Sequence, residues 1–250
     1  MTSFFEQTGL HVQADGRLND FLAVRDRRVL FDGVDLLALV ERLGAPLEVS
    51  FCPRITTRVR DMQAIFARAR ADTGYPGEFV YAYATKSNFA EEVVRTAMTA
   101  GAHYETSSAF DVRIAQRLWR GGILPAERFI FCNGSKEPAY IRAIVDLREA
   151  GFANIVPILD DIHELEALSQ CREPLLLGVR ERKDAGDIAE GATYGYDRFG
   201  LLPDEMQQVA ERLRGTPHRL ILYHAMVGSQ LEDADFFLAE LRESLAGYAR

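Results

Sequence analysis

From Glu78 onward the sequence alternates short apolar runs with amphipathic helical patterns, and this alternation constrains the fold more than any other feature. Each run is rich in Val, Ile, Phe or Tyr and is followed by a polar turn, which is typical of a strand buried in a parallel sheet. Because right-handed crossovers return each strand to a place beside its predecessor, strict alternation predicts a parallel α/β sheet. The predicted strands are FVYAYA (79–84), AHYET (102–106), FIFCN (129–133), NIVPILD (154–160), PLLLGVR (174–180) and LILYHAMV (220–227).

The segments between these runs carry apolar residues at helical spacing. The segment after the second run offers Ser108 as an N-cap, and the segment after the third has Pro138 in a first-turn position. Both signals predict where a helix begins. In the segment after the first run, the residues predicted to share one helical face are Phe89, Val93, Val94 and Met98.

Two parallel architectures fit this alternation, a (β/α) barrel and a doubly wound open sheet. An open sheet that binds dinucleotides carries a GxGxxG turn after its first strand, whereas TKSN (85–88) stands there in this sequence. We therefore predict an α/β fold built on a TIM-type (β/α) barrel. The barrel is incomplete, because six strands are visible and a closed barrel needs eight β/α units. We expect the chain to be the front part of a longer protein; the alternative is that another element closes the sheet.

Residues 1–77 differ in character from the rest. They form a predicted preface of extended stretches and helices that packs on the barrel, and residues 78–250 form the barrel with its first six units. No Ser/Gly-rich linker separates the two parts, so a flexible two-domain arrangement is not indicated. The last helix of the preface places four apolar residues at helical spacing toward the barrel, namely Val59, Met62, Ile65 and Phe66.

Composition narrows the class of protein further. Apolar residues make up 48% of the chain, enough for a globular core, and the formal net charge of -8 argues against a general nucleic-acid binder. Cys52, Cys132 and Cys171 have neither the spacing of a metal site nor an evident pairing, so they read as reduced thiols and no metal is predicted. No signal peptide or membrane-spanning stretch is visible, and we expect a cytoplasmic protein with neither a nucleic-acid nor a membrane partner.

Polar residues follow every predicted strand, at the end where barrels carry their functional groups. Strand ends also become polar simply because the chain meets water there, so each residue alone has an ordinary explanation. As a set they form a predicted ring. The members are Lys86, Glu105, Asn133, Asp160, Asp161, Arg180, His224 and Ser229.

Lys86 stands out in this ring because it follows seven uncharged residues. A lysine held with little solvent loses part of its preference for the ammonium form, and the neutral amine is the nucleophile that forms an imine with an aldehyde. The alternative is a lysine that extends its charged head into water at a strand end. The residues alone leave both open.

The segment VYAYATKSN resembles the first barrel strand of the fold-type III pyridoxal-phosphate decarboxylases, the family of ornithine, diaminopimelate and biosynthetic arginine decarboxylases. That resemblance implies a barrel of the alanine racemase-like kind. The preface and NGSKEPAYI are most similar to the arginine branch. The resemblance continues, in the family's order, through HYETSSAFDV, FIFCNGSKEPAYI, ILDDIHELEAL, LLLGVRER, YDRFGL and HAMVGSQL.

The resemblance implies a role for each matching residue. Lys86 would hold pyridoxal phosphate as an internal aldimine, Glu105 would be the acidic residue close to the cofactor and the lysine, and Arg180 would position the cofactor ring. Gly228 and Ser229 would form the phosphate-side turn, for which an ordinary turn is the alternative. The implied reaction is decarboxylation of a basic amino acid, arginine first and then ornithine, diaminopimelate or lysine. The implied assembly is a homodimer or a higher homo-oligomer.

The sequence also departs from the family. Met226 stands where the family has a histidine stacked on the cofactor, while His224 lies two residues earlier and has an ordinary interior role as its alternative. The family's later glycine-rich loop, EPGR-like segment and C-terminal β domain have no counterpart before Arg250, so we expect this chain alone to be a poor decarboxylase. These departures motivate a second hypothesis, a non-catalytic pyridoxal-phosphate-binding or regulatory relative. A third is a barrel aldolase that forms a lysine Schiff base without a phosphate cofactor.

Overall fold

A computed structural model describes residues 20–182, 199–226 and 233–249 of the protein, and the chain divides into two compact units between Ser50 and Phe51. In the first unit, three antiparallel strands precede a helix, and Asp35 caps that helix by accepting from the Ala38 N–H at 3.0 Å. Its elements are β1 (Leu22–Arg25), β2 (Arg28–Phe31), β3 (Val34–Asp35) and α2 (Leu36–Leu43).

The second unit is built on a six-stranded sheet in which every neighbouring pair is parallel and the strands follow one another in chain order. A doubly wound sheet would reverse its order at a switch point. The prediction of an α/β fold with a barrel-type run of six strands is therefore confirmed. The strands are β4 (Ala82–Ala84), β5 (His103–Thr106), β6 (Ile130–Cys132), β7 (Ile155–Leu159), β8 (Leu176–Arg180) and β9 (Arg219–His224).

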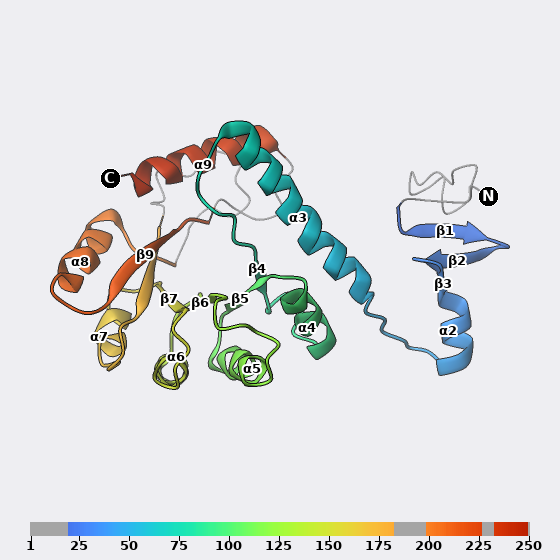
Figure 1. The fold of residues 1–250 in the computed structure, drawn as a ribbon, viewed down its shortest axis with the longest axis horizontal. Helices are drawn as coiled ribbons and strands as arrows, with labels where there is room; N and C mark the ends of the chain where they lie inside the picture. The colour runs from blue at the N-terminus through green and yellow to red at the C-terminus, as the bar shows by residue number, and fades with distance from the viewer. Residues whose placement is uncertain (1–19, 183–198, 227–232, 250) are drawn as a thin grey trace. The chain divides into compact units, whose positions relative to one another are not determined.

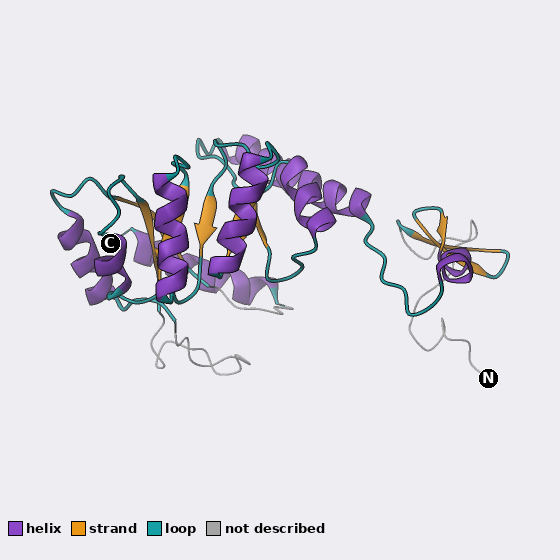
Figure 2. Ribbon diagram, turned by 90° about the horizontal axis from the view of Figure 1, so that it is seen from below, coloured by secondary structure: helices purple, strands orange, loops and turns teal. Residues whose placement is uncertain are grey.

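Helices alternate with these strands, and Figure 1 shows α4 to α8 on the convex side of the curved sheet, with α9 on the other side. Seen from below, the helices stand as a layer in front of the strands (Figure 2). The helices are α3 (Cys52–Thr73), α4 (Glu91–Thr99), α5 (Ala109–Arg120), α6 (Pro138–Glu149), α7 (Glu164–Leu168), α8 (Pro203–Leu213) and α9 (Ala234–Tyr248).

The core lies between the convex face of the sheet and the helices that cover it. The side chains that meet there come from alternate strand positions and from the apolar stripes of the helices, and burying each aliphatic one contributes about 1.5–3 kcal/mol. No helix among the described residues is both long and apolar enough to cross a bilayer. Core side chains without exposure include Tyr104, Ile130, Ile144, Leu159, Leu168 and Leu177.

Both predicted helix starts are confirmed. Ser108 caps α5 by accepting from the Asp111 N–H at 3.2 Å, and Pro138 is the first residue of α6. On α4, Val93, Val94 and Met98 are buried, whereas the prediction for Phe89 was wrong: this ring is 70% exposed because the helix begins only at Glu91.

The helix α3 belongs to the second unit and packs on α4, where Val59 is buried. The other three residues of the predicted apolar stripe, Met62, Ile65 and Phe66, are exposed. Phe66 instead stacks on Phe79 with ring centroids 3.8 Å apart. A helix that packs on one neighbour buries a narrow stripe, and its remaining apolar residues stay at the surface. The domain boundary expected between residues 77 and 78 stays a prediction.

Candidate active site at the carboxyl ends of the strands

A cavity of about 580 Å³ lies on the concave side of the sheet, between the strands and α9. Glu105, Asn133 and His224 line the cavity with polar groups at the carboxyl ends of their strands. Its volume is within the range of sites for small molecules and cofactors. The apolar part of its wall comes from Val80, Phe131, Ile158, Leu222, Leu241 and Leu245.

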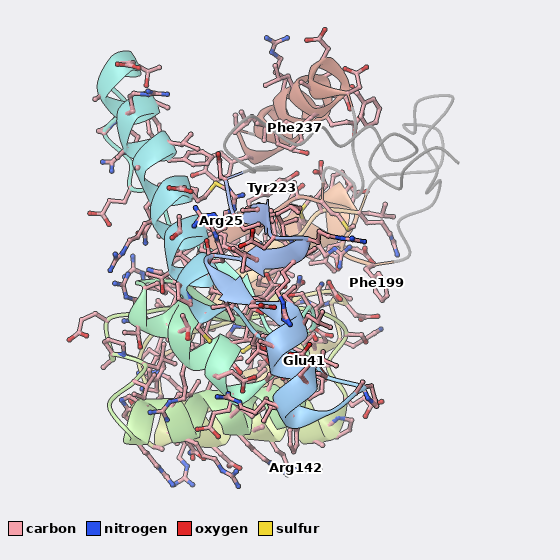
Figure 3. The ribbon with its side chains drawn as sticks, turned by 90° about the vertical axis from the view of Figure 1, so that its right-hand side faces the viewer. Arg25, Glu41, Arg142, Phe199, Tyr223 and Phe237 are labelled. Carbon is pink, nitrogen blue, oxygen red and sulfur yellow. The ribbon has the colours of Figure 1, made fainter. Side chains whose placement is uncertain are left out.

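The helix α9 lines this cavity opposite the strands. Ser244 is buried and its hydroxyl donates to a Glu181 carboxylate oxygen at 3.0 Å, which ties the helix to the end of β8. Tyr223 of β9 packs edge-on to Tyr248 of α9, with centroids 6.0 Å apart. Figure 3 labels Tyr223 below the helix that carries Phe237. The cavity therefore has a helical wall as well as a sheet wall.

Lys86 lies in the turn that follows β4. The turn is held by two hydrogen bonds from Ser87, whose N–H and hydroxyl both donate to the Ala84 carbonyl, at 3.1 and 2.7 Å. The Lys86 Nζ lies 3.9 Å from the Oε1 of Glu105, a residue that lines the cavity. Its side chain is 62% exposed, so of the two alternatives that the residues left open, the structure has the lysine whose charged head extends into water. The reason is that β4 is an edge strand of the described sheet, so a neighbouring strand, β5, flanks the lysine on one side only.

Glu105 connects Lys86 to the next strand along the sheet. The Asn133 amide donates to Glu105 Oε1 at 3.4 Å, the same oxygen that faces the lysine. The Glu105 side chain is 24% exposed and Asn133 is buried. We call Lys86, Glu105 and Asn133 the lysine cluster; it places an amine, a carboxylate and an amide at the ends of three adjacent strands.

Arg180 forms the centre of a second cluster, at the ends of β7 and β8. Its Nη1 lies 3.7 Å from Asp160 Oδ1, and the two side chains are only 7% and 2% exposed. Its Nη2 lies 3.4 Å from the sulfur of Met226, and its guanidinium carbon lies 5.1 Å from the ring centroid of Phe199, labelled in Figure 3. We call Arg180, Asp160, Met226 and Phe199 the arginine cluster. It holds a cation fixed by a carboxylate and an aromatic face.

Of the two aspartates in the predicted ring, the structure brings only Asp160 into a cluster. Asp161 is exposed, and its carboxylate accepts from the His163 N–H at 2.8 Å ahead of α7. His224 lines the cavity, as its place in the ring predicts. Gly228 and Ser229, the predicted phosphate-side turn, lie outside the described residues.

Gly200 is a site residue to which the sequence reasoning gave no role. It has φ +96°, its N–H donates to the Asp160 carbonyl at 3.2 Å, and a Cβ there would lie 2.8 Å from the Arg180 carbonyl oxygen. Leu201 continues the contact by donating to that Arg180 carbonyl at 2.7 Å. Glycine is needed because the backbone lies against the arginine cluster in a left-handed conformation. The sequence signal that could have pointed to Gly200 was its place in YDRFGL, a segment that carries the family resemblance.

Lys136 and Glu164 were also missed. Their ion pair joins Nζ to Oε2 at 3.0 Å, and the side chains are 0% and 7% exposed. Both residues stand in segments that carry the family resemblance, NGSKEPAYI and ILDDIHELEAL. Their pairing could not be read from the sequence, because the residues are 28 positions apart and belong to different β/α units.

Comparisons with known proteins identify the family of the chain. The family model of the pyridoxal-dependent decarboxylase pyridoxal-binding domain matches residues 55–250. Over 228 residues, the chain is 27% identical to the biosynthetic arginine decarboxylase of Thermosynechococcus vestitus, with 84% of this chain and 35% of that protein covered. Over 233 residues, it is 28% identical to the Escherichia coli K12 enzyme, with 86% and 34% covered. The chain thus spans about a third of the length of these curated relatives.

Two solved structures share the fold. The diaminopimelate decarboxylase of M. jannaschii in complex with L-lysine matches with a TM-score of 0.74 at 25% identity, covering 91% of this chain and 52% of that one. The biosynthetic arginine decarboxylase of Campylobacter jejuni matches with a TM-score of 0.77 at 21% identity, covering 92% and 40%. At these identities, the structural similarity shows a shared architecture.

Proposed function

The chain belongs to the pyridoxal-dependent decarboxylases, and from this membership we propose that it binds pyridoxal phosphate through Lys86 as part of an enzyme that decarboxylates a basic amino acid. The observation that carries the proposal is the 3.9 Å distance between the Lys86 amine and the carboxylate of Glu105, which lines the concave cavity. The sequence has three lysines; Lys136 is buried in an ion pair and Lys183 lies outside the described residues. Among the described lysines, Lys86 is therefore the one whose amine is accessible.

The residues present suit this cofactor. A primary amine reacts with its aldehyde, the cavity has room for its ring, and the apolar wall keeps water from the ring's faces. When bound, pyridoxal phosphate supplies the electron sink for decarboxylation. The chain's own residues bind and orient: Glu105, 3.9 Å from the Lys86 amine, can accept its proton. Arg180, held by Asp160, provides a fixed cation for an anionic oxygen.

We infer that the substrate is arginine, with ornithine, diaminopimelate and lysine as the next candidates. The inference is supported by the arginine decarboxylases among the relatives and by the L-lysine bound in the diaminopimelate decarboxylase structure. We also infer a homodimer or higher homo-oligomer, as the family resemblance implies. Because the chain spans about a third of these relatives, substrate and assembly are proposed for the whole protein.

A second candidate function is a non-catalytic or regulatory relative that binds the same cofactor. Met226 supports it, because a thioether that contacts Arg180 at 3.4 Å can pack against a ring but cannot transfer a proton. Release of labelled carbon dioxide from arginine separates the two: turnover by the full-length protein eliminates the non-catalytic candidate. The barrel aldolase has no support from the family match. It predicts a Lys86 imine that forms without pyridoxal phosphate, so the cofactor dependence of the visible band excludes it.

The binding proposal is tested by titrating the protein with pyridoxal phosphate and recording the visible absorbance of the bound cofactor. Reduction with borohydride and peptide mass spectrometry then identify which of the three lysines carries the label. We expect the label on Lys86, and we expect Lys86→Ala and Lys86→Arg to abolish the band while Lys183→Ala retains it. A band that persists in Lys86→Ala defeats the assignment.

A further inference from the structure

Lys136 and Glu164 form a buried network that joins the carboxyl ends of two adjacent strands. The Lys136 ammonium donates to the Gly134 carbonyl at 2.8 Å, to Glu164 Oε2 at 3.0 Å and to the Ile158 carbonyl. Glu164 in turn accepts from the backbone N–H groups of Lys136, at 2.8 Å, and of Asp160, at 3.2 Å. All three ammonium protons and both carboxylate oxygens are thus engaged.

This network begins where the pairing of β6 with β7 stops. The register of β6 and β7 ends with Cys132 opposite Pro157, and a proline has no N–H to donate. One residue further, the Ile158 carbonyl accepts from the Lys136 side chain. The ion pair therefore continues, through side chains, the connection that the backbone ladder no longer provides.

The two ends of the network lead to the two clusters of the candidate site. On the Lys136 side, the chain runs through Gly134 to Asn133, whose amide donates to Glu105. On the Glu164 side, the carboxylate holds the backbone of Asp160, whose carboxylate faces Arg180. The pair thus lies between the lysine cluster and the arginine cluster and contacts the backbone that carries each.

We propose that Lys136 and Glu164 are positioning residues that set the spacing of the lysine and arginine clusters for cofactor binding. This inference rests on the proposed function. A buried ion pair adds little net stability, because its attraction is offset by the loss of hydration, and matched apolar residues can often replace it. Apolar residues cannot, however, donate to Ile158 or hold the Asp160 N–H. Stability and geometry can therefore be separated by mutation.

The experiment compares the parent with the double variant Lys136→Met/Glu164→Leu, which removes both charges together. Three measurements are made: the urea midpoint, amide hydrogen exchange of peptides covering 133–137 and 159–164 without cofactor, and the pyridoxal phosphate dissociation constant. We expect a midpoint close to the parent's, at least tenfold faster exchange in those two peptides with α4 unchanged, and at least tenfold weaker binding. Parental exchange and parental affinity in the double variant overturn the inference.

Two further variants keep the test decisive. If the double variant does not fold, Glu164→Gln is measured in the same way. It retains the shape of the side chain but puts an amide NH₂ group, a donor, where the carboxylate accepts hydrogen bonds from the donors around it. Arg148→Met is the control: it breaks the 3.5 Å ion pair between Arg148 of α6 and Glu173, which precedes β8. We expect this variant to leave amide exchange in the two peptides and the cofactor affinity unchanged. If the parent binds no cofactor, the proposed function fails, while the exchange rates still decide whether the pair holds the strand ends.

Discussion

The lysine cluster and the arginine cluster occupy the ends of one sheet but differ in their contact with water. Lys86 and Glu105 are 62% and 24% exposed, whereas Arg180 and Asp160 are 7% and 2% exposed. Attraction between charges is several-fold weaker in water than inside a protein, so the first pair constrains its members weakly and the second strongly. The difference suits the proposed roles: an amine that must react stays reachable, and a cation that orients a ligand stays in place.

The largest expected effect comes from removing the carboxylate nearest to the buried guanidinium. Asp160→Ala should lower the free energy of unfolding by about 3–5 kcal/mol, because a buried cation loses its counter-charge. Urea denaturation followed by circular dichroism measures this loss. The matched control is Asp161→Ala, whose exposed carboxylate only caps a turn and should cost about 1 kcal/mol. Equal losses in the two variants would contradict the contrast in burial.

His103, the first residue of the strand β5 that also carries Glu105, sharpens the comparison through pH. Burial, with a smaller contribution from Arg128, lowers the pKa of His103 to about 4. The unfolded chain therefore binds more protons between pH 6.5 and 4, so the stabilisation is fully present above pH 6.5 and falls by roughly 3 kcal/mol as the pH drops to 4.

The free energy of unfolding of the parent and of His103→Asn is measured from pH 4 to 8. Asn retains an acceptor for the Phe129 N–H, which donates to His103 Nδ1 at 2.9 Å, but does not titrate. We expect a flatter profile for the variant. The pKa of His218 is also lowered, chiefly by burial, and affects both proteins alike. Superimposable profiles would show that His103 does not contribute.

A substitution at Gly200 tests how closely the backbone packs on the arginine cluster. Gly200→Ala should cost about 2 kcal/mol more than Gly122→Ala, because both glycines have positive φ but a Cβ at Gly122 would meet no atom within 4 Å. A Cβ at Gly200 would lie 2.8 Å from the Arg180 carbonyl oxygen. Urea midpoints of the two variants give the difference. The same cost at both positions would mean that left-handed strain alone explains the glycine.

The smallest effect is expected in the exposed cluster. Glu105→Gln should lower the free energy of unfolding by less than about 1 kcal/mol, because the pair with Lys86 is open to solvent. Its urea curve is compared with that of Asp160→Ala. A loss as large as that of Asp160→Ala would remove the distinction between the two clusters.

Much of the fold could be predicted from local patterns. Periodicity predicted the strands, and Ser108 and Pro138 predicted helix starts, because capping and φ restriction act within a few residues. The pattern failed for Phe89 and for three apolar residues of α3, which are exposed. Helical spacing shows which residues share a face, but only the neighbouring elements decide how wide a face is covered.

The sequence by itself determined that Lys86, Glu105, Asp160 and Arg180 lie at the carboxyl ends of four strands, and in a parallel sheet the carboxyl ends of all strands lie on one edge. Only the tertiary structure decided that Lys86 is exposed, that Asp160 rather than Asp161 faces Arg180, and that Lys136 pairs with Glu164. Chain direction and periodicity are local properties that sequence spacing encodes. Solvent exposure and charge pairing depend on side chains from other elements, brought together only by folding.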